Sequence, residues 1–101
     1  GTPNKTLKVN NTGGELLAKN QLNLKANELI NKGKIISEGN VDIDIKQSYT
    51  HTQDDQIAAN GTLKFNTDND LINQSELTAG QKLELSAKNI RISQFVEKTN
   101  N

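Results

Sequence analysis

The chain has 101 residues, the length of one small domain, which argues against a multidomain enzyme. Twelve Lys and Arg residues balance twelve Asp and Glu residues, so the chain lacks the basic excess that nucleic-acid-binding proteins use. It has no cysteine, which excludes disulfides, thiolate chemistry and cysteine-based zinc sites. Only 32% of the residues are hydrophobic and fifteen are asparagine, so a folded chain must place its few apolar residues very regularly.

The apolar residues follow a repeat of about twenty residues, which divides the chain into four units at 16–34, 35–56, 57–76 and 77–93. Each unit reads L-x-A, a gap, L-x-L-x-A, a second gap and L-x-N-x-G. Like residues recur at the same place in successive units and so form columns. The main columns are Leu16, Ile35, Ile57 and Leu77; Leu22, Val41, Leu63 and Leu83; Leu24, Ile43, Phe65 and Leu85; and Leu29, Tyr49, Leu71 and Ile90.

Inside each unit the apolar residues are two positions apart, as in Leu22, Leu24 and Ala26. A period of two is typical of a β-strand with one buried face, and the spacing of three and four that marks a helix is absent from these segments. Three short strands joined by bends would make each unit one turn of a coil, and stacked turns bury a continuous column of side chains. The pattern therefore predicts an all-β chain, a parallel β-helix (solenoid) of about four to five coils of 19–22 residues.

Asparagine and glycine are expected at the bends between these strands. Asn tolerates left-handed backbone and bonds neighbouring main chain, and Asn11, Asn31 and Asn73 recur at one corner, where they are predicted to stack as an amide ladder. The second unit is two residues longer than its neighbour, and its acidic segment 53–56 is predicted to be a surface loop. Five glycines fall at other bends, where a positive φ costs glycine little: Gly13, Gly33, Gly39, Gly61 and Gly80.

Three strings of the sequence carry a resemblance to a known repeat: ANELINKGKI at 26–35, SYTHT at 48–52 and LINQSELTAG at 71–80. They resemble the filamentous-hemagglutinin repeats of two-partner-secretion exoproteins, which include large adhesins and contact-dependent growth inhibition proteins. The resemblance covers roughly residues 14–93. It implies a right-handed β-helix, export through an outer-membrane partner transporter and a place on the bacterial cell surface.

The same resemblance implies a structural role rather than catalysis. The segment would form part of a rod used for adhesion or for delivery of a contact-dependent toxin, with a receptor or glycan on a host or target cell as a further partner. It implies no cofactor, and we assign no catalytic, cofactor-binding or metal-binding residue. We expect the chain to be an internal piece of a much longer rod, whose uncapped ends associate end to end.

The remaining candidate residues have simpler structural interpretations. His51, the single histidine, is predicted to be a corner side chain that makes a hydrogen bond, because no second His or Cys could complete a transition-metal site. Tyr49 is in register with two leucines and is expected in the core. The acidic segments 54–55 and 68–70 are expected to be solvated loops rather than calcium sites, because the glycine-rich calcium repeat is absent.

The acids Asp42 and Asp44 leave an alternative function open. Both are expected to project outward, and paired carboxylates on a β-helix could do acid–base or calcium work, as in pectin-degrading enzymes. A sugar site also needs basic and aromatic neighbours, and Lys25 and Lys64 more simply neutralise the two acids across strands. The alternative is a carbohydrate-active β-helix enzyme or glycan-binding module; a third interpretation is a trimeric phage tail-spike segment. The favoured prediction is that the chain is not an enzyme.

Overall fold

The fold consists of strands alone. In the computed structural model the described residues are 8–92 and 97–99. They contain no helix, and therefore no helix long and apolar enough to cross a membrane. The strands are β1 (Lys8–Ala18), β2 (Gln21–Ala26), β3 (Glu28–Ser37), β4 (Asn40–Ile45), β5 (Tyr49–His51), β6 (Gln56–Ala59), β7 (Thr62–Thr67), β8 (Asp70–Asn73), β9 (Leu77–Ala79), β10 (Lys82–Ser86), β11 (Asn89–Ile92) and β12 (Glu97–Thr99).

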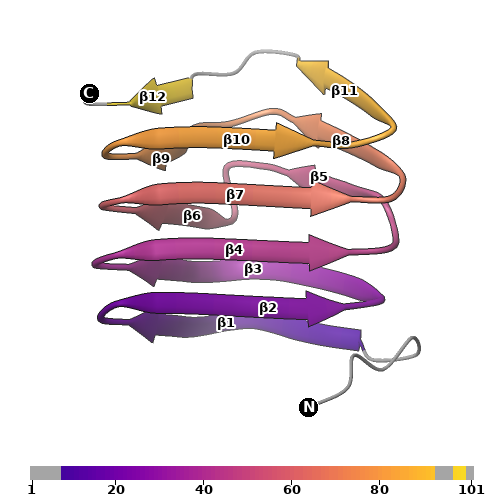
Figure 1. Cartoon of the computed structure of the whole chain (residues 1–101). Helices are drawn as coiled ribbons and strands as arrows, with labels where there is room; N and C mark the ends of the chain where they lie inside the picture. Colours follow the sequence, from indigo (N-terminus) through magenta and orange to yellow (C-terminus); the bar gives the residue numbers. More distant parts are fainter. Residues whose placement is uncertain (1–7, 93–96, 100–101) are drawn as a thin grey trace.

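These strands wind into a right-handed solenoid (Figure 1). In this view the nearer strands β2, β4, β7 and β10 run from left to right, the strands behind them return, and the chain rises from rung to rung. All pairings are parallel and form three sheets, in the orders β1-β3-β6-β9-β12, β10-β7-β4-β2 and β11-β8-β5. The predicted parallel β-helix is thus confirmed.

The strand register brings together the residues of each predicted column. Along the second sheet, Leu24 of β2 pairs with Ile43 of β4, Ile43 with Phe65 of β7, and Phe65 with Leu85 of β10. On the third side, Tyr49 pairs with Leu71 of β8. A shift of one strand by one residue relative to its neighbour would turn all of its apolar side chains outward. The two-residue period of apolar residues therefore determines the register.

A single narrow core runs along the axis. Its central members, among them Ile43 and Phe65, are completely buried, whereas Leu22 near one end of the stack and Leu83 near the other are half-buried. Each coil buries its inner face only against the coils above and below, so few apolar residues per coil suffice. This explains how a chain with so modest an apolar content folds.

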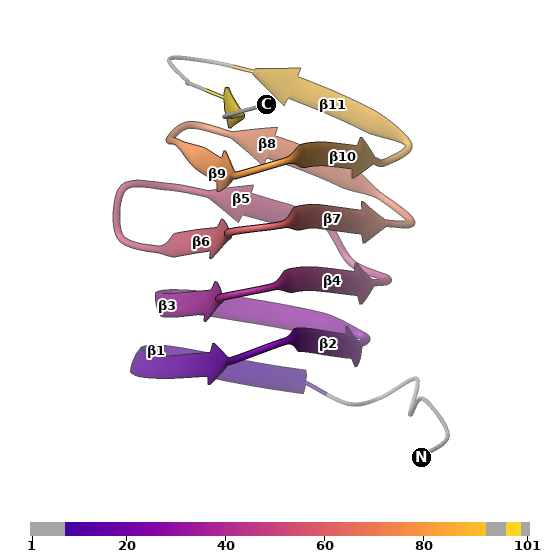
Figure 2. The same cartoon turned by 60° about the vertical axis from the view of Figure 1, so that its left-hand side comes forward.

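One side of the solenoid departs from the expected three short strands per coil. β1 and β3 each continue through a corner without interruption, which joins two of the expected strands. In β1 the corner is made by a register shift between Thr12 and Glu15, where Gly13 has a φ of 70°. In the next coil the longer loop separates β5 from β6, so here the expected division remains (Figure 2).

Most of the corner glycines are needed because the backbones of successive coils approach closely, and not because the corner requires a positive φ. Gly13 alone among the described glycines has a positive φ, so that expectation is wrong for Gly33, Gly39, Gly61 and Gly80. A Cβ on Gly39 would overlap the backbone carbonyl of Asn20 in the preceding coil. Successive coils are one strand spacing apart, and at a sharp corner this spacing leaves no room for a side chain.

Replacing Gly39 by Ala should therefore destabilise the fold. The methyl group would force the coil away from Asn20 and strain the hydrogen bond from Asn40 N to Asn20 O, which is 2.9 Å long. We expect a loss of about 1–3 kcal/mol in the free energy of unfolding, measured by urea denaturation. Glu38→Ala, at the exposed neighbouring position, is the control and should change it by less than about 0.5 kcal/mol. Equal effects of the two substitutions would contradict the close-approach role.

Candidate functional site

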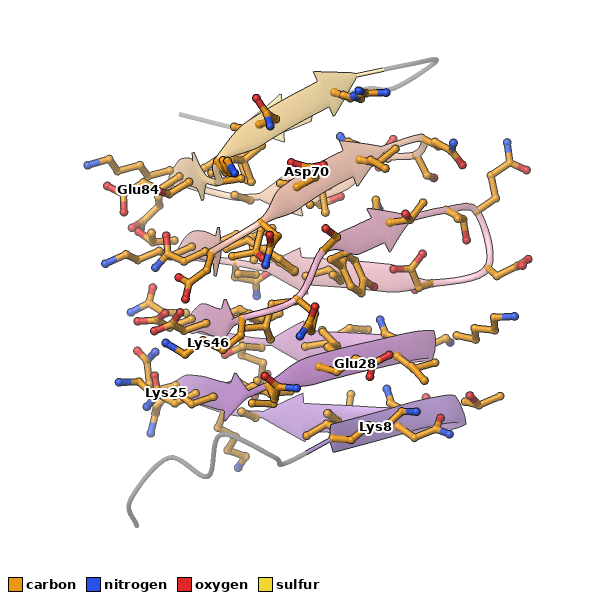
Figure 3. All side chains as sticks on the ribbon, turned by 90° about the vertical axis from the view of Figure 1, so that its right-hand side faces the viewer. Lys8, Lys25, Glu28, Lys46, Asp70 and Glu84 are labelled. Atoms are coloured by element: carbon orange, nitrogen blue, oxygen red, sulfur yellow. The ribbon has the colours of Figure 1, made fainter. Side chains whose placement is uncertain are left out.

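The outward acids of β4 lie among lysines, as expected. Asp44 is in register with Lys25 of β2, and Asp42 with Lys64 of β7. Farther along this face Glu84 lies 2.8 Å from the Lys82 ammonium (Figure 3), whose hydrogen bond and charge lower the pKa of the Glu84 carboxyl. Opposite charges therefore alternate across the strands, which is the arrangement of a solvated sheet surface.

Among the described residues, this face lacks the aromatic partner that a sugar site uses. Tyr49 and Phe65 are both buried in the core, where their ring centroids are 5.0 Å apart, and Phe95 lies outside the described residues. No described aromatic ring is therefore available to stack on a sugar beside Asp42 and Asp44. The geometry gives the carbohydrate-active alternative no support among the described residues.

The acids at 68–70 are also engaged with their neighbours. Asp68 is exposed and forms an ion pair with Lys46, 3.2 Å away, and Asp70 accepts a hydrogen bond of 3.0 Å from Asn89 (Figure 3). Over the part of the chain that the structure describes, no group of three or more His, Cys, Asp and Glu side chains is placed to hold a metal ion.

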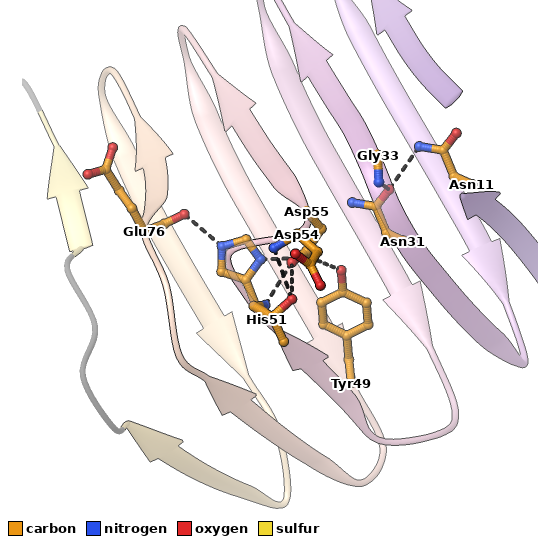
Figure 4. Close-up of polar contacts among 9 residues, drawn as sticks. Asn11, Asn31, Gly33, Tyr49, His51, Asp54, Asp55 and Glu76 are labelled. Carbon is orange, nitrogen blue, oxygen red and sulfur yellow. Dashed lines mark hydrogen bonds and ion pairs between the residues drawn. The ribbon is translucent and has the colours of Figure 1, made fainter. Parts of the chain in front are cut away.

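A buried cluster of Tyr49, His51 and Asp55 stands out from this surface pattern (Figure 4). We call it the Tyr–His–Asp cluster. The Tyr49 hydroxyl donates to Oδ2 of Asp55, and His51 Nδ1 lies 2.8 Å from the same oxygen. Oδ1 of Asp55 accepts hydrogen bonds from the backbone N–H of Thr52 at 2.7 Å and, at 3.4 Å, from its hydroxyl. His51 Nε2 donates to the backbone carbonyl of Glu76 at 2.7 Å.

The cluster confirms two expectations and overturns a third. His51 is a hydrogen-bonded corner side chain and Tyr49 is in the core, as predicted. Asp54 is exposed, but Asp55 is only 6% exposed, so the expectation of a solvated charge was wrong for this residue. One signal of this burial was available: Asp55 precedes the core residue Ile57 by two positions, and a period of two places both on the inner face.

Burial makes the cluster a structural unit rather than an exposed reactive site. The pKa of Tyr49 is raised, chiefly by burial and then by the charge of the Asp55 carboxylate and by the hydrogen bond to it. Both ring nitrogens of His51 are occupied, and its side chain is fully buried. The arrangement ties the loop after β5 back to the core and to the coil above it.

The amide ladder is present in part. Asn11 Nδ2 donates to Asn31 Oδ1 at 2.8 Å and to the carbonyl of Lys34 at 3.1 Å, so two successive coils are joined through their Asn side chains. The ladder does not extend to Asn73, because His51 takes the place of an asparagine in the intervening coil and pairs with Asn73 in the strand register. Neither polar atom of the buried Asn73 side chain has a partner among the described residues.

Comparison with known proteins places these observations in context. The haemagglutinin repeat family matches residues 2–47 and 36–100. Toxin CdiA of Yersinia pestis is similar to the chain, with 36% identity over 99 residues. That match covers 97% of this chain but 3% of the toxin, so the chain spans a small part of the length of this relative. No solved structure matches the chain.

Proposed function

The chain belongs to the haemagglutinin repeat family, and on that basis we propose that it is a structural segment of a secreted bacterial surface exoprotein. The segment forms part of an extended β-helical rod, used for adhesion or for delivering a contact-dependent toxin. The rod crosses the outer membrane through a partner transporter and meets a receptor or glycan on another cell. No catalysis and no cofactor is assigned to this segment.

The observation that carries the proposal is the burial along the column of core residues. Its central members are completely buried, and its first and last members are only half-buried. Leu63 is completely buried in the middle of one column, whereas Leu22 and Leu83, near the two ends of that column, are half-buried. Coils added at either end would bury these side chains further, so the fold favours continuation over closure. A stack of this kind lengthens by about 4.8 Å with each coil, and its stability is a sum over neighbouring coils.

A deletion that keeps the register tests this role in the parent exoprotein. Removing residues 35–76 joins Lys34 to Leu77, which then takes the place of Ile35 in its column. We expect the shortened exoprotein to be exported and displayed, and to adhere or deliver toxin as well as its parent, because the segment contributes length alone.

The matched control removes residues 35–66 and joins Lys34 to Thr67, out of register. This variant should fail to fold and to reach the cell surface. The proposal fails if the in-register deletion is displayed at the parental level but no longer adheres or delivers toxin, because the segment would then contain the receptor-binding site itself.

The half-buried ends further support end-to-end self-association of the isolated chain. Leu22 of β2 and Leu83 of β10 are half-buried, and these two strands are the outer members of the second sheet, so each offers an edge for parallel pairing. Sedimentation over a range of concentrations should show dimers and longer species that increase with concentration. A chain that stays monomeric at high concentration would contradict this proposal.

A further inference from the structure

The strand ladder is interrupted on one side of the solenoid. β5 pairs with β8 above it but not with β3 below it, although Leu29 of β3 and Tyr49 of β5 belong to one column. Upward pairing of β3 begins only at Lys34, opposite Gln56 of β6. The stretch 28–33 is therefore paired with β1 alone, and the last backbone bonds before the break run from Lys46 N and Gln47 N to Asn27 O.

Two hollows mark the incomplete closure along this break. One, of 230 Å³, lies between residues 29–32 of β3 and the segment 48–52 that contains β5. The other, of 460 Å³, lies where the loop residues 53–56 project over the glycine corners at 13–15 and 32–34. The loop is visible in Figure 2 as the wide connection between β5 and β6. Elsewhere on the first and second sides the strands of successive coils are hydrogen-bonded.

The segment Ser48–Asp55 is stabilised mainly by contacts with the coil above it and with the core. β5 contributes three register pairs with β8, the Tyr49 ring packs on Phe65 of β7, and His51 bonds to the Glu76 carbonyl. Across the break, the buried amide nitrogen of Asn31 has no hydrogen-bond partner among the described residues. The bond from His51 to the Glu76 carbonyl and the contact of Tyr49 with Phe65 are thus the side-chain anchors of a strand that has a one-sided backbone ladder, whereas the bonds to Asp55 join this strand to its own loop (Figure 4).

We propose that the segment 48–55 is a flap that opens outward while the other sides of the solenoid stay paired, with the hydrogen bond from His51 to the Glu76 carbonyl and the contact of the Tyr49 ring with Phe65 as the latch that keeps it closed. A short strand with one paired edge opens at a lower free energy than strands paired on both edges. Opening exposes the core residue Leu29 and the unpaired upper edge of β3. The flap is a conformational feature of this segment of the rod, and its opening does not depend on whether the rod is used for adhesion or for toxin delivery.

Thiol labelling tests the flap directly, because the chain has no cysteine of its own. Leu29→Cys places a thiol under the flap, and Val41→Cys places one in β4, which is paired on both edges. In the 101-residue chain under native conditions, we expect the thiol at 29 to react with a thiol reagent at least about tenfold faster than the thiol at 41.

Substitutions in the latch distinguish a thiol that is labelled because the flap opens from a thiol that is already exposed in the closed chain. His51→Leu removes the hydrogen bond to the Glu76 carbonyl but keeps an apolar side chain of similar size, and should accelerate labelling at position 29 by about ten- to a hundredfold without changing labelling at 41. Thr50→Ala, on the exposed side of the same strand, is the control and should alter neither rate. The proposal is overturned if His51→Leu accelerates both thiols equally, which indicates global unfolding, or accelerates neither.

Hydrogen exchange on the unmodified chain gives a second measurement that needs no variant. The hydrogen-bonded amides of residues 49–51 should exchange at least about tenfold faster than those of residues 43–45 in β4. Equal protection of the two strands would refute the flap even if a substituted chain failed to fold.

Discussion

Leu63→Asp is expected to abolish folding, whereas Lys64→Gln is expected to be nearly neutral. Leu63 of β7 is completely buried and lies between Val41 and Leu83 in the inner column. A carboxylate there would lose its hydration and find no partner, which costs several kcal/mol, comparable to the roughly 5–15 kcal/mol stability of a whole domain. Lys64 points outward and is exposed.

Circular dichroism and urea unfolding of the two variants measure this difference. The Leu63→Asp chain should lack the β signal of the parent in buffer, while the Lys64→Gln chain should unfold within about 0.5 kcal/mol of it. If both substitutions had the same effect, alternate residues of β7 would not face opposite sides, and the period of two could not account for the fold.

The columns of core residues could be predicted because a parallel β-helix repeats one environment in every coil. Residues such as Ile43 and Phe65 occupy the same inward position one coil apart, so a twenty-residue period and a two-residue alternation together define the strand pairs. Pairing and burial follow from these two periods without any knowledge of how sharply each corner bends. The family resemblance and the fold were therefore accessible from the sequence.

The corners were less accessible, because their geometry depends on how closely successive coils approach. Gly39 is needed for its contact with the backbone of Asn20, which lies nineteen positions earlier, and local turn rules do not describe such a contact. Asp55 looked like loop charge, since the buried partners that stabilise it come from Tyr49 and His51 on the preceding strand. In both cases the decisive neighbour belongs to the assembled corner rather than to the repeat pattern.

The break between β3 and β5 has the same origin. The second unit carries a two-residue insertion, and the sequence alone indicated only a loop at that place. In the structure β5, which precedes this longer loop, is paired with β8 above it and not with β3 below it, and the bonds of the Tyr–His–Asp cluster join β5 to the loop. An insertion that would be neutral in a surface loop of a globular domain thus changes the connection between two coils.

Raising the pH above 10 is expected to destabilise the chain through Tyr49. The pKa of this hydroxyl is raised above its ordinary value of 10.0 by burial and by the neighbouring Asp55. Between pH 10 and the higher folded-state pKa, the unfolded chain releases the proton and the folded chain keeps it. The contribution of Tyr49 to stability is therefore complete below pH 10 and decreases by about 1.4 kcal/mol per pH unit above it.

The near-ultraviolet absorbance of tyrosinate follows this titration without interference, because Tyr49 is the single tyrosine and the chain has no tryptophan. Ionisation should appear well above pH 10, as the segment 48–55 opens, either before or together with the loss of the β signal in circular dichroism. Tyr49→Phe is the control. Between pH 10 and about pH 12 its free energy of unfolding should decrease less than that of the parent chain, and the difference should reach up to roughly 2.7 kcal/mol. A Tyr49 that ionises with a midpoint near 10 while the β signal stays native would show that the hydroxyl is accessible to water, and the segment 48–55 would then not be closed.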